Sequence, residues 1–211
     1  KMKSIFTAIA FGVILSSSYA FPVALQGKAV YAAEVNEKQV MAFISEMAND
    51  GLSFLSNKEL TTEQKKARFK KMLDTSFDIK TIARFALGLH WKSASEKEKT
   101  EYVGLFEKMV IDVYSRRFSE YNGQEFEVIG AQKRGKKDFV VTSSILPPEG
   151  EKGPDVRVDW RVRNRNGDLR VIDIIVEGIS MGQTQRSDFA AVIQKGQGEV
   201  EYLLAELRKN N

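Results

Sequence analysis

The sequence predicts an α+β fold in which helices wrap around a strongly curved antiparallel sheet of about four strands. Three observations lead to this prediction. Apolar residues recur at helical spacing through residues 34–121. From residue 124 the apolar period changes to two, as in strands, and over residues 183–208 a helical period returns. A helical half, a strand-rich half and a closing helix are typical of α+β proteins and not of alternating α/β proteins.

Four helices are expected in the first half. The first covers residues 35–55, the second begins at a cap provided by Thr61 or Thr62, and the third covers residues 78–89. The fourth begins at Ser95 with the capping box Ser-Glu-Lys-Glu and is expected to run to about residue 121. Its apolar arc covers roughly half of the helix circumference, more than a surface helix needs. Such an arc indicates contact with two apolar bodies, and a central core helix without any ligand would explain it equally well.

The sheet is expected over residues 124–180. Its clearest strand is residues 156–162, where three valines and Trp160 alternate with charged residues, so that one face is buried and the other is wet. Asn166-Gly167 supplies the positive φ angles of a type I′ hairpin turn, and residues 169–177 form the returning strand. In the closing helix, Gly196 and Gly198 mark a weak point.

Residues 1–32 are expected to be a secretory signal peptide, and residues 33–211 a single domain. The segment has a basic start, an apolar run of about a dozen residues and small residues after it. Cleavage after Ala20 or after Ala32 fits the small-residue rule, and the later point is preferred because the acidic, helix-like sequence begins at Glu34. The alternative is an uncleaved N-terminal anchor, for which the apolar run is short.

Composition argues against several classes of function. Three of the four net positive charges come from lysines in residues 1–32, so the remaining chain carries a net charge of +1 and no nucleic-acid partner is expected. Cysteine is absent and His90 is the sole histidine, so we expect neither a transition-metal site nor a catalytic triad. The sequence contains no glycine-rich phosphate loop, and no cofactor is expected.

Asp173 is the best candidate for a catalytic carboxylate. It alternates in phase with Leu169, Val171 and Ile175, so it could lie inside a small α+β cone and act as a general base, as in an enzyme resembling ketosteroid isomerase. Both faces of its strand are largely apolar, however, so it could equally lie on the solvent side near Arg157 or Arg161. No complete catalytic constellation is found.

The second half contains a run that resembles a known family. Val-Glu-Gly-Ile-Ser-Met at residues 176–181, with Thr184, Arg186, Ser187 and Phe189, is similar to the signature of the MlaC (toluene-tolerance) family of periplasmic phospholipid-binding proteins. Further similar segments are residues 77–78, 82–88 with Trp91, 107–124 and 159–161. The resemblance extends over about residues 37–207, and the joint order of the segments carries it more than any single motif.

This resemblance implies a lipid carrier and not an enzyme. The family implies an NTF2-like cone of helices and curved sheet around a deep apolar pocket, which holds the acyl tails of a diacyl phospholipid with the head group near the rim. It also implies a monomer in the periplasm, the soluble component of an ABC-type lipid transport system that maintains outer-membrane asymmetry. Its partners would be an outer-membrane lipoprotein complex and an inner-membrane ABC transporter complex. One branch of the family is associated with hopanoids, so a hopanoid or another apolar lipid is the alternative ligand.

Two sets of site residues are expected. The pocket wall should include Val110, Val113, Tyr114, Phe118, Val158, Trp160, Val162 and Ile174, although the same residues could fill a solid core. Arg157, Arg161 and Arg163 on the wet face of one strand could dock on acidic surfaces of the partner complexes. The alternative for these arginines is a solvated face of ion pairs with the interspersed aspartates.

Overall fold

The computed structural model describes residues 34–210. The expected signal peptide and its two cleavage points lie outside these residues. Within the described range, no helix has both the length and the apolar character needed to cross a membrane.

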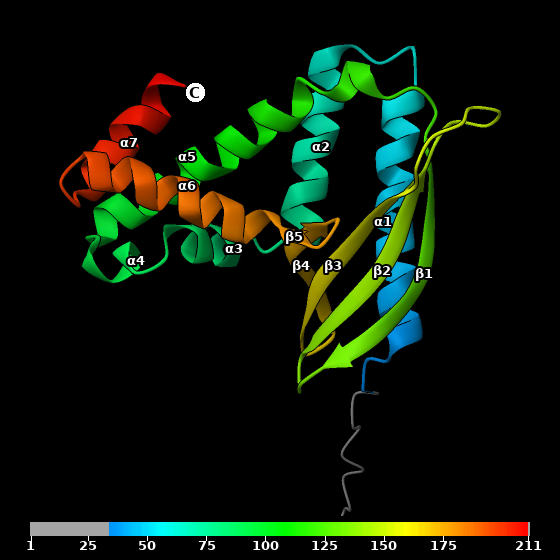
Figure 1. Cartoon of the computed structure of the whole chain (residues 1–211), viewed down its shortest axis with the longest axis horizontal. Helices are drawn as coiled ribbons and strands as arrows, with labels where there is room; N and C mark the ends of the chain where they lie inside the picture. The colour runs from blue at the N-terminus through cyan, green and yellow to red at the C-terminus, as the bar shows by residue number, and fades with distance from the viewer. Residues whose placement is uncertain (1–33, 211) are drawn as a thin grey trace, which may run out of the picture. The chain divides into compact units, whose positions relative to one another are not determined.

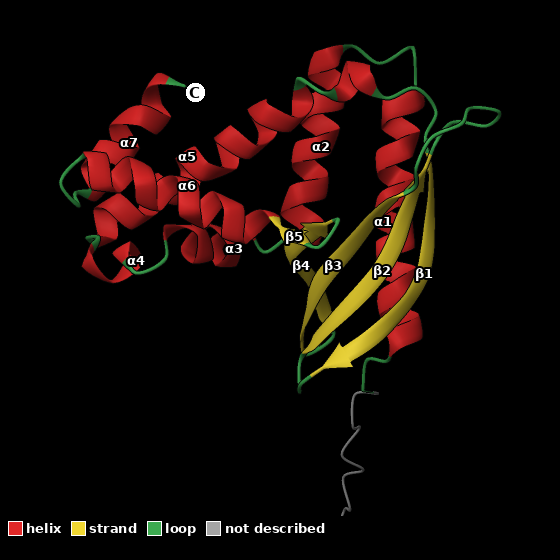
Figure 2. Cartoon of the chain, in the orientation of Figure 1, coloured by secondary structure: helices red, strands yellow, loops and turns green. Residues whose placement is uncertain are grey.

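The described residues form an antiparallel sheet and a set of helices, which confirms the α+β class (Figures 1 and 2). The helices are α1 (Glu37–Ser56), α2 (Thr62–Ser76), α3 (Ile79–Leu87), α4 (His90–Ser93), α5 (Glu96–Ser115), α6 (Met181–Lys195) and α7 (Val200–Lys209), with a 3₁₀ turn η1 (Phe118–Glu120). The strands are β1 (Glu125–Arg134), β2 (Asp138–Leu146), β3 (Val156–Arg165), β4 (Asp168–Val176) and β5 (Ile179–Ser180). Each strand pairs with the next in the chain.

The sheet has five strands, where about four were predicted. The additional strand is β5, two residues that pair with β4 after a tight reversal. Glu177 and Gly178 make this reversal with φ angles of 49° and 80°. A strand of two residues is too short to give a period-two signal, so the sequence could not show it.

Several predicted chain signals are confirmed. Ser95 caps α5 in a capping box with Glu98, and Thr61 caps α2. Asn166 and Gly167 form the hairpin turn between β3 and β4 with φ angles of 56° and 99°. These signals act over three or four residues, which is why they can be read without knowledge of the fold.

Two predicted helix boundaries are wrong. The helix expected to run to residue 121 ends at Ser115, and the chain continues in η1. The helix expected over residues 183–208 is divided into α6 and α7 at Gly196 and Gly198. A Cβ atom on Gly196 would lie 2.2 Å from Cβ of Tyr202, so the glycine is needed for α7 to fold back at this place.

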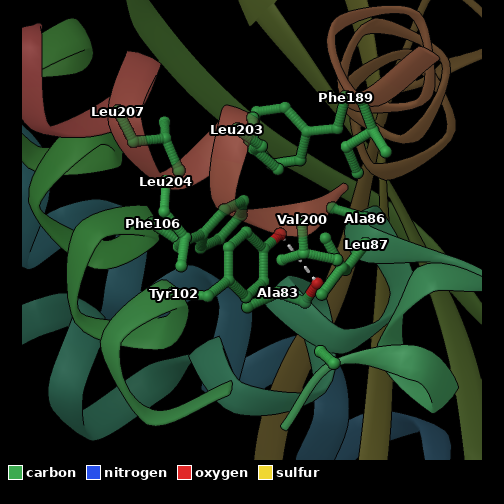
Figure 3. Packing of buried hydrophobic residues seen from close by; sticks show 12 residues of the cluster. Ala83, Ala86, Leu87, Tyr102, Phe106, Phe189, Val200, Leu203, Leu204 and Leu207 are labelled. Atoms are coloured by element: carbon green, nitrogen blue, oxygen red, sulfur yellow. Dashed lines mark hydrogen bonds between the residues drawn. The ribbon is translucent and has the colours of Figure 1, made fainter. Parts of the chain in front are cut away.

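The domain has two apolar cores. In one, α1 packs on the inner face of the sheet through Val40, Ile44, Val141 and Val162. In the other, α3, α5, α6 and α7 pack together around Tyr102 (Figure 3). The Tyr102 hydroxyl donates a hydrogen bond to the carbonyl of Ala83 at 3.0 Å, and burial raises its pKa, so the phenol stays neutral.

Candidate functional site

A cavity of about 960 Å³ lies between the two cores. It is bounded by the C-terminal half of α1, by α2, α3 and the C-terminal half of α5, by the inner face of the sheet and by the first turn of α6. Most of the wall is apolar, which is the composition expected of a site for an apolar ligand.

Helix α5 contributes to both the helical core and the cavity wall. Tyr102 packs in the helical core and Val113 lines the cavity, whereas Phe106, Met109 and Val110 contact both. Their spacing of three and four residues places them along one side of the helix. The wide apolar arc read from the sequence is therefore explained by contact with both the helical core and the cavity.

The sheet provides the opposite wall through side chains that are neighbours across strands. Phe126 pairs with Ile145, which pairs in turn with Val156, and Trp160 pairs with Ile174. All five line the cavity. The indole Nε1 of Trp160 donates to Oγ of Ser143 at 2.9 Å, so the polar atom of this large side chain is satisfied and its ring is oriented.

Of the eight residues expected in the pocket wall, the structure places six on the cavity. These are Val110, Val113, Tyr114, Phe118, Trp160 and Ile174. The other two, Val158 and Val162, do not line it: they are 3% and 0% exposed, in the packed layer of the sheet. They share a face of β3 with Trp160, and alternation cannot distinguish a covered residue from a lining one on the same face.

Sequence reasoning missed the contributions of the first two helices. Met47, Leu52 and Leu55 of α1 and Phe69 and Met72 of α2 line the cavity. Their helical period predicted a buried face, but the sequence contains no signal for what lies opposite that face.

The cavity has a polar rim where α5 ends and the sheet begins. Arg117, Glu120, Tyr121, Gln124 and Glu125 are among its lining residues. The turn η1 is fixed from inside by Phe118, whose ring packs edge-on against Phe54 at 6.0 Å and Phe69 at 5.5 Å between centroids. The early end of α5 thus places an aromatic anchor inside and charged groups at the rim.

Asp173 borders the cavity, but its carboxylate is directed to α6. It is 7% exposed, its Oδ1 accepts from the backbone N–H of Gly182 at 3.1 Å, and its Oδ2 accepts from the hydroxyl of Ser180 at 2.7 Å. Ser180 is itself the N-cap of α6 and accepts from the backbone N–H of Gln183. Asp173 is therefore buried at the cavity and not on the solvent side, and its two hydrogen bonds connect β4 to the first turn of α6.

The three arginines considered for docking lie on the face of β3 opposite to Trp160. Each lies next to an aspartate: Arg157 binds Asp159, and Arg161 and Arg163 both lie near Asp138. The pair between Arg163 and Asp138 is bidentate, with two distances of 2.8 Å, and it lowers the pKa of Asp138. Arg157 keeps most of its side chain exposed.

The described residues contain no group of three or more histidine, cysteine, aspartate or glutamate side chains placed to hold a metal ion. His90 lies half-buried in the short helix α4.

Comparison with curated proteins finds relatives of this chain, among them the following two. The chain is 21% identical over 125 residues to the intermembrane phospholipid transport system binding protein MlaC of Haemophilus influenzae, covering 59% of this chain and 58% of that protein. It is 24% identical over 110 residues to the toluene tolerance protein ttg2D of Pseudomonas putida, covering 52% and 50%. The chain thus spans between half and three fifths of the length of these relatives.

Comparison with solved structures and family models extends this likeness. The phospholipid-binding protein of Ralstonia solanacearum, solved in complex with a phospholipid, has the same fold, with a TM-score of 0.68 and 21% identity over 80% of this chain and 94% of that one. The model of the family described as MlaC protein matches residues 45–209. Since that match covers most of the chain, this protein belongs to the MlaC family.

Proposed function

We propose that this protein is a lipid carrier whose cavity holds the acyl chains of a diacyl phospholipid. The observation that carries the proposal is the cavity itself, about 960 Å³ in volume and mainly apolar. Burial of each methylene group away from water is worth about 0.8 kcal/mol, so an acyl chain of ordinary length gains on the order of 10 kcal/mol in such a site. A carrier needs this apolar space and a polar rim, and it needs no catalytic group.

The transport role is proposed from the relatives. One of them is named as the binding protein of an intermembrane phospholipid transport system, and the Ralstonia protein was solved with a phospholipid. We propose that the present chain acts in the periplasm, where it passes lipid as a monomer between an outer-membrane lipoprotein complex and an inner-membrane ABC transporter complex. The curved sheet and the helices facing it would then serve as an NTF2-like cone around the lipid tails.

Lipid retention by purified protein tests this proposal. Native mass spectrometry and lipid extraction should show a diacyl phospholipid bound to the protein. A polycyclic terpenoid in its place would favour the hopanoid alternative. Protein that is empty and takes no lipid from vesicles would contradict the carrier function.

A charged residue in the wall should expel the lipid. Val113 lines the cavity and is 38% exposed, so Val113→Asp should leave the fold intact. An unpaired carboxylate beside acyl chains is costly, and we expect lipid occupancy to fall by at least about tenfold. The matched control is Ile129→Asp, which changes an apolar residue that is 61% exposed on β1 and does not line the cavity. Equal lipid occupancy in the two variants would show that Val113 is not part of the lipid site.

A further inference from the structure

The rim of the cavity carries charged side chains that retention of acyl chains does not require. Arg117 and Glu120 belong to the turn around η1, and Glu125 is the first residue of β1. All three are among the residues that line the cavity. Charged groups at the mouth of an apolar site are placed to meet the polar part of its ligand.

The backbone holds Arg117 and Glu120 on the same side of the rim. The N–H of Glu120 donates to the carbonyl of Arg117 at 3.0 Å, which is the bond of a 3₁₀ turn. In such a turn the side chains of residues i and i+3 eclipse each other. The chain after η1 is also fixed, because the N–H of Asn122 donates to Oε1 of Gln124 at 2.9 Å.

Arg117 and Glu120 form only a weak ion pair with each other. Their closest nitrogen and oxygen atoms are 4.0 Å apart, and the side chains are 69% and 67% exposed. An exposed pair at the limit of ion-pair distance is stabilised only weakly. Either side chain can therefore form an ion pair with a charged ligand instead, with little loss of free energy from the pair that it leaves.

The balance of charge around the cavity favours one class of head group. Arg117 is the one cationic residue among the described residues that line it, against the carboxylates of Glu120, Glu125 and Asp173. The carboxylate of Asp173 already accepts two hydrogen bonds from the start of α6. Hydrogen bonds from neutral donors do not remove a negative charge, so the lining has three carboxylates and one cation, and a head group with net negative charge would meet net negative charge there.

From this balance we infer that the rim is a subsite for a zwitterionic head group, with the phosphate beside Arg117 and the ammonium beside Glu120 and Glu125. The inference rests on the proposed carrier function and adds a preference to it. A phosphate accepts charge-assisted hydrogen bonds from a guanidinium, and an ammonium donates them to carboxylates.

Competitive loading from vesicles tests this subsite. Purified protein, stripped of lipid, is incubated with vesicles containing equal amounts of phosphatidylethanolamine and phosphatidylglycerol with identical acyl chains, and the bound lipid is counted by mass spectrometry. The parent should be enriched in phosphatidylethanolamine by about twofold to fivefold, the size expected for exposed charge contacts. Glu120→Gln with Glu125→Gln should abolish the enrichment. The control, Glu127→Gln with Glu149→Gln, removes two exposed carboxylates that do not line the cavity and should keep it.

A second pair of variants separates the phosphate contact from the ammonium contact. Arg117→Gln should lower the loading of both lipids about equally, while Arg116→Gln, its exposed neighbour that does not line the cavity, should not. Equal uptake of the two lipids by the parent, or an enrichment that survives the double glutamine variant, would overturn the subsite and leave the carrier function standing. Failure of the parent to load either lipid would overturn both.

Discussion

At the scale of single residues, the buried carboxylate of Asp173 connects two elements of the fold. Its two oxygens accept from the Gly182 N–H and the Ser180 hydroxyl, which places the first turn of α6 beside β4 and the cavity. Gly182 is needed there, because a Cβ atom would lie 3.0 Å from Oδ1 of Asp173. In Asp173→Asn only one of the two acceptor oxygens remains, and the negative charge that strengthens these hydrogen bonds is removed. We expect the free energy of unfolding to fall by about 1–3 kcal/mol in urea titrations, with lipid still bound by the folded fraction.

The control for this change is Asp168→Asn, the same substitution at an exposed position of the same strand. It should alter stability by less than about 0.5 kcal/mol. If both variants unfold like the parent, Asp173 does not anchor α6. Loss of the envelope permeability barrier in a strain that carries only Asp173→Asn, with fold and lipid load intact, would instead favour chemistry at this residue.

At the scale of elements, the pairing of β2 with β3 contains a pH-dependent contribution to stability. The hydrogen bonds and charge of Arg163 hold the pKa of Asp138 below its ordinary value. A carboxylate with a lowered folded-state pKa stabilises the fold at pH values above its unfolded pKa of about 3.9, and this stabilisation is lost as the pH falls through the folded pKa. Asp138→Asn should therefore lower the melting temperature at pH 7. Below about pH 4, the melting temperature of this variant should fall less steeply with decreasing pH than that of the parent. Asp155→Asn, which changes an exposed aspartate before β3, should leave the profile of the parent unchanged, and identical profiles for all three proteins would contradict the assignment.

At the scale of the whole molecule, the face of β3 that lines the cavity and the charged face of β3 lie on opposite sides of the sheet. Trp160 faces the cavity, while Arg157 and Arg161 lie on the other side and remain 62% and 42% exposed. Electrostatic docking through these arginines remains a prediction. Reversal of both to glutamate should slow lipid transfer to a reconstituted partner by about tenfold at low salt, since steering raises association rates by that factor or more. Lipid retention should not change, because neither side chain lines the cavity.

Salt and a charge-matched variant provide the controls for docking. The defect should shrink as salt rises, because screening acts over about 8–10 Å at physiological ionic strength. Reversal of Lys38 and Lys58, exposed on α1 and just after it, changes the net charge by the same amount and should not slow transfer. Equal rates for the parent and the arginine variant at low salt would identify these residues as ordinary ion-paired surface.

The sequence by itself determined the α+β class, the caps at Thr61 and Ser95 and the Asn166-Gly167 hairpin, and its ordered motifs indicated the family that the comparisons then showed. These features depend on local hydrogen bonds, on periodicity and on residue order, all of which lie in the chain itself. Only the tertiary structure decided that β5 exists, that α5 ends at Ser115, and that Val113 lines a cavity while Val162 fills a core. The physical reason is that periodicity identifies only which face of a helix or strand is buried. Whether that face packs against other side chains or lines a cavity depends on the distance to the opposite elements, which the tertiary structure sets.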